Sequence, residues 1–269
     1  MLVVGERINS TRKLIRPAIE ARDVEAITAE VAMQMDAGSN YLDCNAATVG
    51  VEKEPEYLEW LVKTVQGASN NTPCALDSPS SKAIEAALAV HDSSNGVPII
   101  NSISAEVEKY DSLMPLVRDA GCRVVALVMD DEGIPKTAEA RITIGRKLVS
   151  DLIGAGIAVD SIYVDPLVFP VGAEANAGVA VLETIQTLKA EFEGLHFVCG
   201  LSNVSYGLPN RKLLNQAFMV LTMAAGLDAV IVDPTDKKLM SLVYAAEALL
   251  GRDEYCAEYI QAARAEKLD

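Results

Sequence analysis

Aspartate and asparagine side chains recur along this 269-residue chain about every 32 residues, each after a short apolar run. The set comprises Asn9, Asp43 with Asn45, Asp77, Asn101, Asp130, Asp165, Asn203 and Asp233. Any one of them is explained equally well as a helix N-cap, because Asp and Asn are common there. However, all eight strand ends carry Asp or Asn, and none carries Ser or Thr. Taken together, the set predicts carboxylates and amides that converge on one polar pocket.

Such a pocket suits a neutral, polar heterocycle. A carboxylate accepts two adjacent N–H donors, which a pterin presents through its 2-amino group and N3–H, and Asn side chains can meet its other polar atoms. A phosphorylated sugar fits poorly, because the segments LSNVSYG (201–207) and VDPTDK (232–237) lack a glycine-rich phosphate nest.

Other kinds of catalytic site find little support in the sequence. His91 is predicted on a helix and His196 at the start of a strand, so neither is well placed as a general base. No Cys or His cluster shows metal-ligand spacing, and we therefore expect no intrinsic metal. Ser202 and Ser205 lack an evident base, and Lys136 is only a remote Schiff-base candidate.

Short β-branched runs and segments of helical period alternate along the chain eight times. The strand-like runs are residues 2–9, 41–45, 73–78, 98–104, 123–130, 162–168, 196–203 and 228–234. Among the helices, Pro55 suits a first turn, and Leu58, Leu61, Val62 and Val65 then form an apolar stripe. We expect the same pattern at Leu214, Phe218 and Leu221.

This order requires a parallel sheet, and the length is close to the roughly 250 residues of a (β/α)₈ barrel. No Pro-, Gly- or Ser-rich linker divides the chain, so residues 1–269 are predicted to form one α/β domain, a (β/α)₈ TIM barrel. An open doubly wound sheet is the alternative, but it would usually carry GxGxxG after its first strand, where this chain has GERINS.

Composition narrows the function classes. The formal net charge is −15, from 23 Lys and Arg against 38 Asp and Glu, which opposes binding to nucleic acid or to anionic membranes. The five cysteines form no CxxC pair, as expected of core thiols in a reducing compartment. The N-terminus lacks a secretory signal and no run is long enough to cross a bilayer, so a cytoplasmic protein is expected.

Several motifs resemble those of the methyltetrahydrofolate:corrinoid protein methyltransferases, in order and spacing over nearly the whole chain. They are GERIN (5–9), YLDCN (41–45), LDS (76–78), INS (100–102), DPL (165–167) and GLSNVS (200–205). The most specific is GLSNVS, which is followed by NR (210–211) and GLDAVIVDP (226–234).

The resemblance implies a homodimeric barrel that holds tetrahydrofolate or 5-methyltetrahydrofolate as substrate, while a separate corrinoid protein docks its cobalamin over the barrel mouth. The residues that match the pterin shell are Asp43, Asn45, Asp77, Asn101, Asp165 and Asn203. Asn203 matches the amide near N5 and is the expected catalytic residue, since N5 is a poor leaving group without a hydrogen-bond donor. No acid with a tuned pKa is evident, so we expect water to carry the proton.

Five further residues are weaker candidates. Glu6 and Asn9 match motif positions without an assigned role, and Arg211 is a candidate contact for the folate tail. Asp130 and Tyr206 depart from the family pattern, which leaves the corrinoid partner and the direction of methyl transfer open.

Two alternatives remain at the level of sequence. A dihydropteroate synthase shares the barrel and the pterin site, but it should show a Ser- and Gly-rich first loop and a Ser-x-Lys/Arg pair after the seventh strand. Those places read INSTRK (8–13) and LSNVSYG (201–207) here. The other alternative is a non-catalytic folate-binding subunit.

Overall fold

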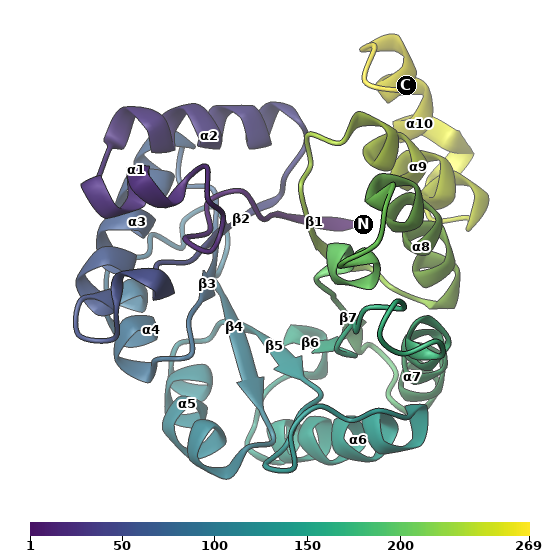
Figure 1. Ribbon diagram of the computed structural model, residues 1–269, viewed down its shortest axis with the longest axis horizontal. Coiled ribbons are helices and arrows are strands. Elements are labelled where there is room, and N and C mark those ends of the chain that lie inside the picture. Colours follow the sequence, from purple (N-terminus) through teal and green to yellow (C-terminus); the bar gives the residue numbers. More distant parts are fainter.

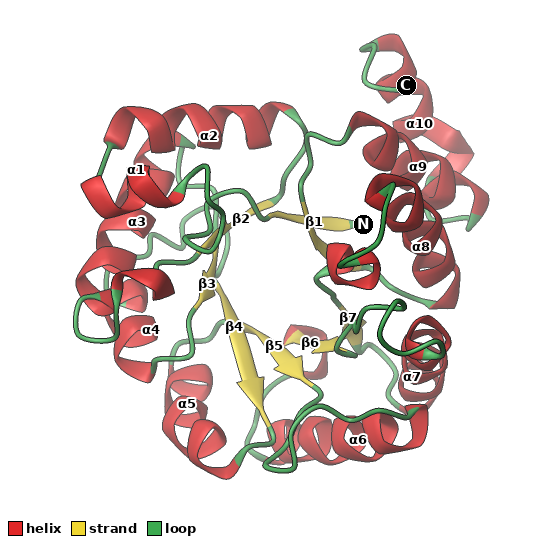
Figure 2. Ribbon diagram, viewed as in Figure 1, coloured by secondary structure: helices red, strands yellow, loops and turns green.

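The computed structural model describes residues 1–269 and shows eight parallel strands enclosed by helices (Figures 1 and 2). The strands are β1 (Leu2–Gly5), β2 (Tyr41–Cys44), β3 (Cys74–Asp77), β4 (Ile99–Ser104), β5 (Arg123–Leu127), β6 (Ile162–Asp165), β7 (His196–Phe197) and β8 (Ala229–Val232). Seven neighbouring pairs form ladders, and β7 meets β8 through hydrogen bonds that include Ile231 N to Cys199 O at 3.0 Å. The predicted (β/α)₈ TIM barrel is confirmed.

Helices cover the outside of the barrel, and α10 projects beyond it at the C-terminus (Figure 1). They are α1 (Arg16–Ala21), α2 (Val24–Asp36), α3 (Glu54–Ala68), α4 (Ser81–Leu88), α5 (Val107–Asp119), α6 (Ala138–Gly154), α7 (Ala177–Glu191), α8 (Arg211–Ala225), α9 (Lys237–Leu249) and α10 (Ala257–Arg264). None of them combines the length and apolar character that a membrane span requires.

The predicted stripe of α3 is confirmed. Pro55 lies in its first turn, where the missing N–H costs no helical hydrogen bond, and Leu58, Leu61, Val62 and Val65 are all fully buried. Burial of these four side chains fixes the rotation of α3 about its axis, because they occupy one face at a spacing of three to four residues.

The predicted stripe of α8 is wrong in part. Phe218 is buried, but Leu214 and Leu221 lie on the outer face, 36% and 54% exposed. The buried face instead runs through Met219 and Met223, one to two positions further along the helix. Both faces of α8 are apolar, so periodicity alone did not show which one faces the barrel.

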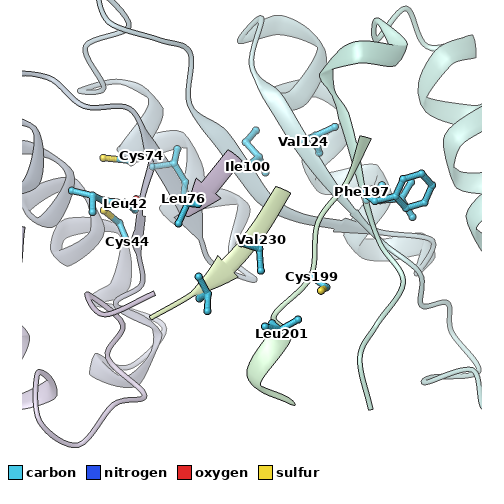
Figure 3. Close-up of a cluster of buried hydrophobic side chains, with 14 of the residues drawn as sticks. Leu42, Cys44, Cys74, Leu76, Ile100, Val124, Phe197, Cys199, Leu201 and Val230 are labelled. Carbon is cyan, nitrogen blue, oxygen red and sulfur yellow. Dashed lines mark hydrogen bonds between the residues drawn. The ribbon is translucent and has the colours of Figure 1, made fainter. Parts of the chain in front are cut away.

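Two separate cores hold the barrel together. The larger lies between strands and helices, where Leu42, Leu76, Ile100, Val124 and Val230 point outward from their strands (Figure 3). The smaller fills the barrel interior with one side chain from each strand or its direct continuation. Its members are Val4, Tyr41, Ala75, Ile99, Val125, Tyr163, Val198 and Ala229, all at most 5% exposed. We call these eight residues the plug, because they close the barrel below the strand ends.

Four of the five cysteines are buried, as expected, and Cys256 before α10 is exposed. His91 lies after α4 and not on it as expected; its Nε2 accepts a hydrogen bond from the Cys74 N–H at 3.2 Å. His196 begins β7 as expected, stacks on Tyr163 and contacts Asp228 at 3.0 Å. It therefore lies at the opposite end of the strand from the carboxyl end.

Candidate functional site

A cavity of about 430 Å³ opens at the carboxyl ends of the strands, above the plug. Only two of its fourteen lining residues are hydrophobic. The fourteen lining residues are Glu6, Asn9, Thr11, Arg12, Asp43, Asp77, Asn101, Ser102, Leu127, Asp165, Gly200, Ser202, Asn203 and Ile231. The carboxyl end of the strands is also where TIM-barrel enzymes place their active sites.

The floor of this cavity follows from strand periodicity. Alternate residues of a strand face the same side, so the residue two positions after each plug residue also points inward. These floor residues, in strand order, are Glu6, Asp43, Asp77, Asn101, Leu127, Asp165, Gly200 and Ile231, and all eight line the cavity. Of the predicted polar ring, Asp43, Asp77, Asn101 and Asp165 lie on this floor, and Asn9 and Asn203 line the cavity from the loops beyond it. The floor residue of β1 is Glu6, and β5, β7 and β8 contribute no polar side chain to the floor.

Two aspartates share an amide at one side of the floor. Asn9 Nδ2 donates to Asp43 Oδ2 and to Asp77 Oδ2, both at 3.2 Å. Asn45 Nδ2 donates to the same Asp77 oxygen at 3.0 Å, and its own Oδ1 accepts from the Ser10 hydroxyl at 2.7 Å. Asn45 is buried behind the cavity wall, so its observed role is to orient Asp77.

Asp165 and Asn203 lie on the opposite side, around Gly200. Asp165 Oδ1 accepts the Leu167 N–H at 2.8 Å, which fixes the carboxyl at the end of β6. Asn203 lies in the short 3₁₀ helix Leu201–Ser205 that follows β7. A Cβ atom at Gly200 would be 3.3 Å from Asn203 Nδ2, so the missing side chain of Gly200 leaves room for this amide.

Burial shifts the acid–base behaviour of the floor. It raises the pKa of Asp77 and of Asp165 to about 6, although the hydrogen bonds each accepts oppose the shift. It also raises the pKa of Glu6 to about 7, and that of Asp43 well above its ordinary value with help from the Asp77 charge. The expectation that no acid here has a tuned pKa was therefore wrong. Poorly solvated carboxyls gain most from a ligand that brings its own N–H donors.

Arg12, the cation that lines the cavity, was not predicted from the sequence. Its guanidinium lies 3.6 Å from Glu6 Oε1 and 3.1 Å from Asp233 Oδ2, and Arg7 contacts the same Asp233 oxygen at 3.0 Å. Asp233, predicted to join the ring, instead serves these two arginines. Thr11 and Ser202 were also missed, because the short motifs around them gave no sign of which side chains turn inward.

Three weaker candidates lie outside the cavity. Asp130 is three residues beyond the inward-facing Leu127 and sits in a turn closed by the Gly133 N–H, which donates to the Asp130 carbonyl at 2.9 Å. Tyr206 is 69% exposed on the loop before α8. Arg211 donates to Ser202 O at 2.7 Å and so braces the segment that carries Asn203. No group of three or more His, Cys, Asp or Glu side chains is arranged to hold a metal ion.

The chain belongs to the family of pterin-binding enzymes, whose sequence model matches residues 5–233. Within that family it is 34% identical to the methylcorrinoid:tetrahydrofolate methyltransferase of Eubacterium limosum, over the whole of this chain and 98% of the relative. It is also 31% identical to the methionine synthase of Mycobacterium tuberculosis, where the match covers 86% of this chain but only 20% of the larger relative.

Solved structures of dihydropteroate synthases share the fold. The enzyme from Vibrio fischeri superposes with a TM-score of 0.71 at 17% identity, covering 93% of both chains. The enzyme from Xanthomonas albilineans with 4-aminobenzoic acid gives 0.69 at 20% identity, covering 94% of this chain and 92% of the other. At these identities the likeness shows the barrel alone.

Proposed function

We propose that this single-domain enzyme, residues 1–269, moves a methyl group between N5 of tetrahydrofolate and the cobalt of a corrinoid protein, in either direction. The observation that carries the proposal is the pairing of a carboxyl-rich floor, formed by Asp77, Asn101 and Asp165, with the Asn203 amide above Gly200. The name of the full-length relative, a methylcorrinoid:tetrahydrofolate methyltransferase, supports the same reaction.

The floor supplies the binding step. Asp77 and Asp165 are acceptors with raised pKa values, and the 2-amino and N3–H groups of a pterin satisfy one of them as adjacent donors. Asn101 offers both a donor and an acceptor between them, while Leu127 and Ile231 give the ring apolar contact. The folate is thereby fixed at its pterin end.

Asn203 supplies the transition-state step. Charge changes on N5 as its bond to the methyl group forms or breaks, and a preorganised amide stabilises that change. Loss of one such donor costs roughly 3 to 4 kcal/mol in comparable sites. The corrinoid, carried by its own protein, accepts or supplies the methyl group when it is bound.

The rim of the barrel mouth fits a protein partner. Large apolar side chains are exposed after five of the strands, on four loops and in the first turn of α5, at the end of the barrel where the cavity opens. They are Leu14, Val51, Val107, Ile134 and Tyr206, between 47% and 89% exposed. Exposed apolar groups around a polar pocket are typical of a docking surface, and we assign this rim to the corrinoid protein. Ile134→Glu and Tyr206→Glu should slow transfer with the corrinoid protein but leave transfer with free cobalamin unchanged.

A second copy of the chain fits the outer face of α8. The exposed side chains Leu213, Leu214, Ala217, Val220, Leu221 and Ala224 form an apolar stripe along it. The helix contains no Asp or Glu, although the net charge is −15, so this face avoids the repulsion that two such molecules meet elsewhere. The proposed homodimer should become monomeric on Leu221→Glu, as measured by sedimentation velocity.

The buried free cysteines support a cytoplasmic location.

The deciding experiment is single-turnover absorbance spectroscopy on the purified protein. Tetrahydrofolate is mixed with methylcobalamin, and methyltetrahydrofolate with reduced cobalamin, using the wild-type protein and Asn203→Ala. Transfer by the wild type that falls at least ten-fold in the variant, about 1.4 kcal/mol or more, supports the reaction and the role of Asn203. Tight folate binding without transfer, even when corrinoid protein is added, would instead show a folate-binding subunit.

A further inference from the structure

Glu6 and Asn203 lie on either side of one apolar side chain. Glu6 extends β1, and its N–H donates to Val232 O of β8 at 3.0 Å. On the other side of β8, Ile231 forms a bridge with Gly200, over which the Asn203 amide lies. The Ile231 side chain faces the cavity between them and has no polar atom. Glu6 and Asn203 therefore flank Ile231 and line the same cavity, so a substrate nitrogen near Asn203 can reach Glu6 directly or through one water.

Glu6 is also the one floor carboxyl that no hydrogen bond occupies. Asp77 accepts two amide N–H groups, Asp43 accepts one, and Asp165 accepts the Leu167 N–H. The Glu6 carboxyl has only the ion contact with Arg12, at 3.6 Å. Both of its oxygens remain free to take or give a proton, whereas each of the other three carboxyls has one oxygen engaged in a hydrogen bond that orients the floor.

The charges that face Glu6 come from four elements and partly cancel. Arg12 on the loop after β1 and Arg211 on α8 favour the carboxylate, and Asp233 after β8 favours the acid. The nearby Asp43 on β2 interacts with Glu6 in the same sense as Asp233. Burial outweighs these charges and raises the pKa of Glu6 to about 7. A group with this pKa can both hold and accept a proton near neutral pH.

We propose that Glu6 exchanges the N5 proton during methyl transfer; this inference rests on the proposed function. In the direction that methylates the folate, the N5 lone pair forms the bond to the methyl carbon, and the cobalt–carbon bond breaks with its electron pair left on cobalt. The N5–H bond then breaks, and its proton passes to the Glu6 carboxylate. In the opposite direction the protonated Glu6 returns that proton to N5 as the methyl group leaves.

The test compares both directions across pH 5.5 to 8.5 by single-turnover spectroscopy. In the wild type, methylation of tetrahydrofolate should rise with pH through about 7, because it needs the carboxylate, and demethylation should fall over the same range. Glu6→Gln should be at least ten-fold slower in both directions and lose this pH dependence, while its affinity for folate stays within two-fold. Glu6→Asp should recover part of the rate together with the pH dependence. Glu52→Gln, at an exposed carboxyl on the loop after β2, is the matched control.

The outcomes separate the two proposals. If the wild type transfers no methyl group, the proposed function fails and this inference fails with it. If the wild type is active but Glu6→Gln keeps its rate within two-fold and its pH profile, the function stands and the role of Glu6 is overturned. Loss of folate binding in Glu6→Gln, with a wild-type unfolding midpoint, would also overturn it in favour of a binding role.

Discussion

The buried carboxyl of Asp165, a proposed binding group, should lower the free energy of unfolding. Burial raises the pKa of its carboxyl from 3.8 to about 6. Between these two values the folded state holds more protons than the unfolded state, so stability falls as the pH rises through this window. The shift of about 2 pKa units corresponds to at most about 3 kcal/mol, and roughly half of that loss falls between pH 5 and 8.

Asp165→Asn removes this titration. The free energy of unfolding, measured by urea denaturation at pH 5, 6, 7 and 8, should fall by about 1 to 1.5 kcal/mol less over this range in the variant than in the wild type. The comparison uses the slope with pH because the amide also loses one acceptor, which shifts all values together. The same variant should lose folate binding, since an amide cannot accept two adjacent N–H donors.

Equal pH slopes in the two proteins would refute this reasoning. Such a result would mean that the Asp165 carboxyl is well solvated in the folded protein, and the raised pKa values of its neighbours would then come into question as well. A variant that keeps wild-type folate affinity would separately refute the binding role of Asp165.

Two further substitutions test the candidate site and the stability of the barrel. Gly200→Ala should reduce the rate of methyl transfer about three- to ten-fold with little change in folate affinity. The reason is that a Cβ 3.3 Å from Asn203 Nδ2 displaces that amide by a few tenths of an ångström. A wild-type rate would show that the position of the amide is not critical. Asp228 has the opposite pH behaviour to Asp165: burial disfavours its charge, but the His196 contact and the Phe197 N–H together hold its pKa below the ordinary value. Asp228→Asn should therefore cost on the order of 1 kcal/mol at pH 7 in thermal or urea unfolding, and the difference from the wild type should vanish as the pH falls below about 4.

The fold was predictable because the residue pattern within each strand and helix indicates the type of element. The stripe of α3 and the helix start at Pro55 follow from spacing alone. The two apolar faces of α8 could not be ranked in this way, since the choice depends on what lies opposite the helix. Tertiary packing, not local preference, decided that element.

The floor of the site was predictable where an Asp or Asn side chain is in phase with the inward-facing residues of its strand. Asp43, Asp77, Asn101 and Asp165 point inward because each lies two residues beyond a plug residue. Asp130 failed the same test by one residue, because β5 turns Leu127 inward and an odd step faces the opposite side. Knowing the phase of each strand would have corrected the ring at β5.

The raised pKa values could not be read from residue types. Glu6 appears in the sequence as an ordinary carboxylate beside an arginine, and its acid–base behaviour depends on how deeply the barrel encloses it. Arg12 was missed for a related reason, because its loop folds back over the cavity through long-range contacts with Asp233.

The plug makes the cavity a well with a single opening. Its eight side chains are almost completely inaccessible, so neither solvent nor ligand passes through the barrel from below. If a partner protein covers the rim, the contents of the well cannot exchange until that partner departs. Under the proposed function the two substrates must therefore bind in a compulsory order, with folate first and the corrinoid protein second, and an excess of the corrinoid protein should trap folate inside the enzyme and slow its release.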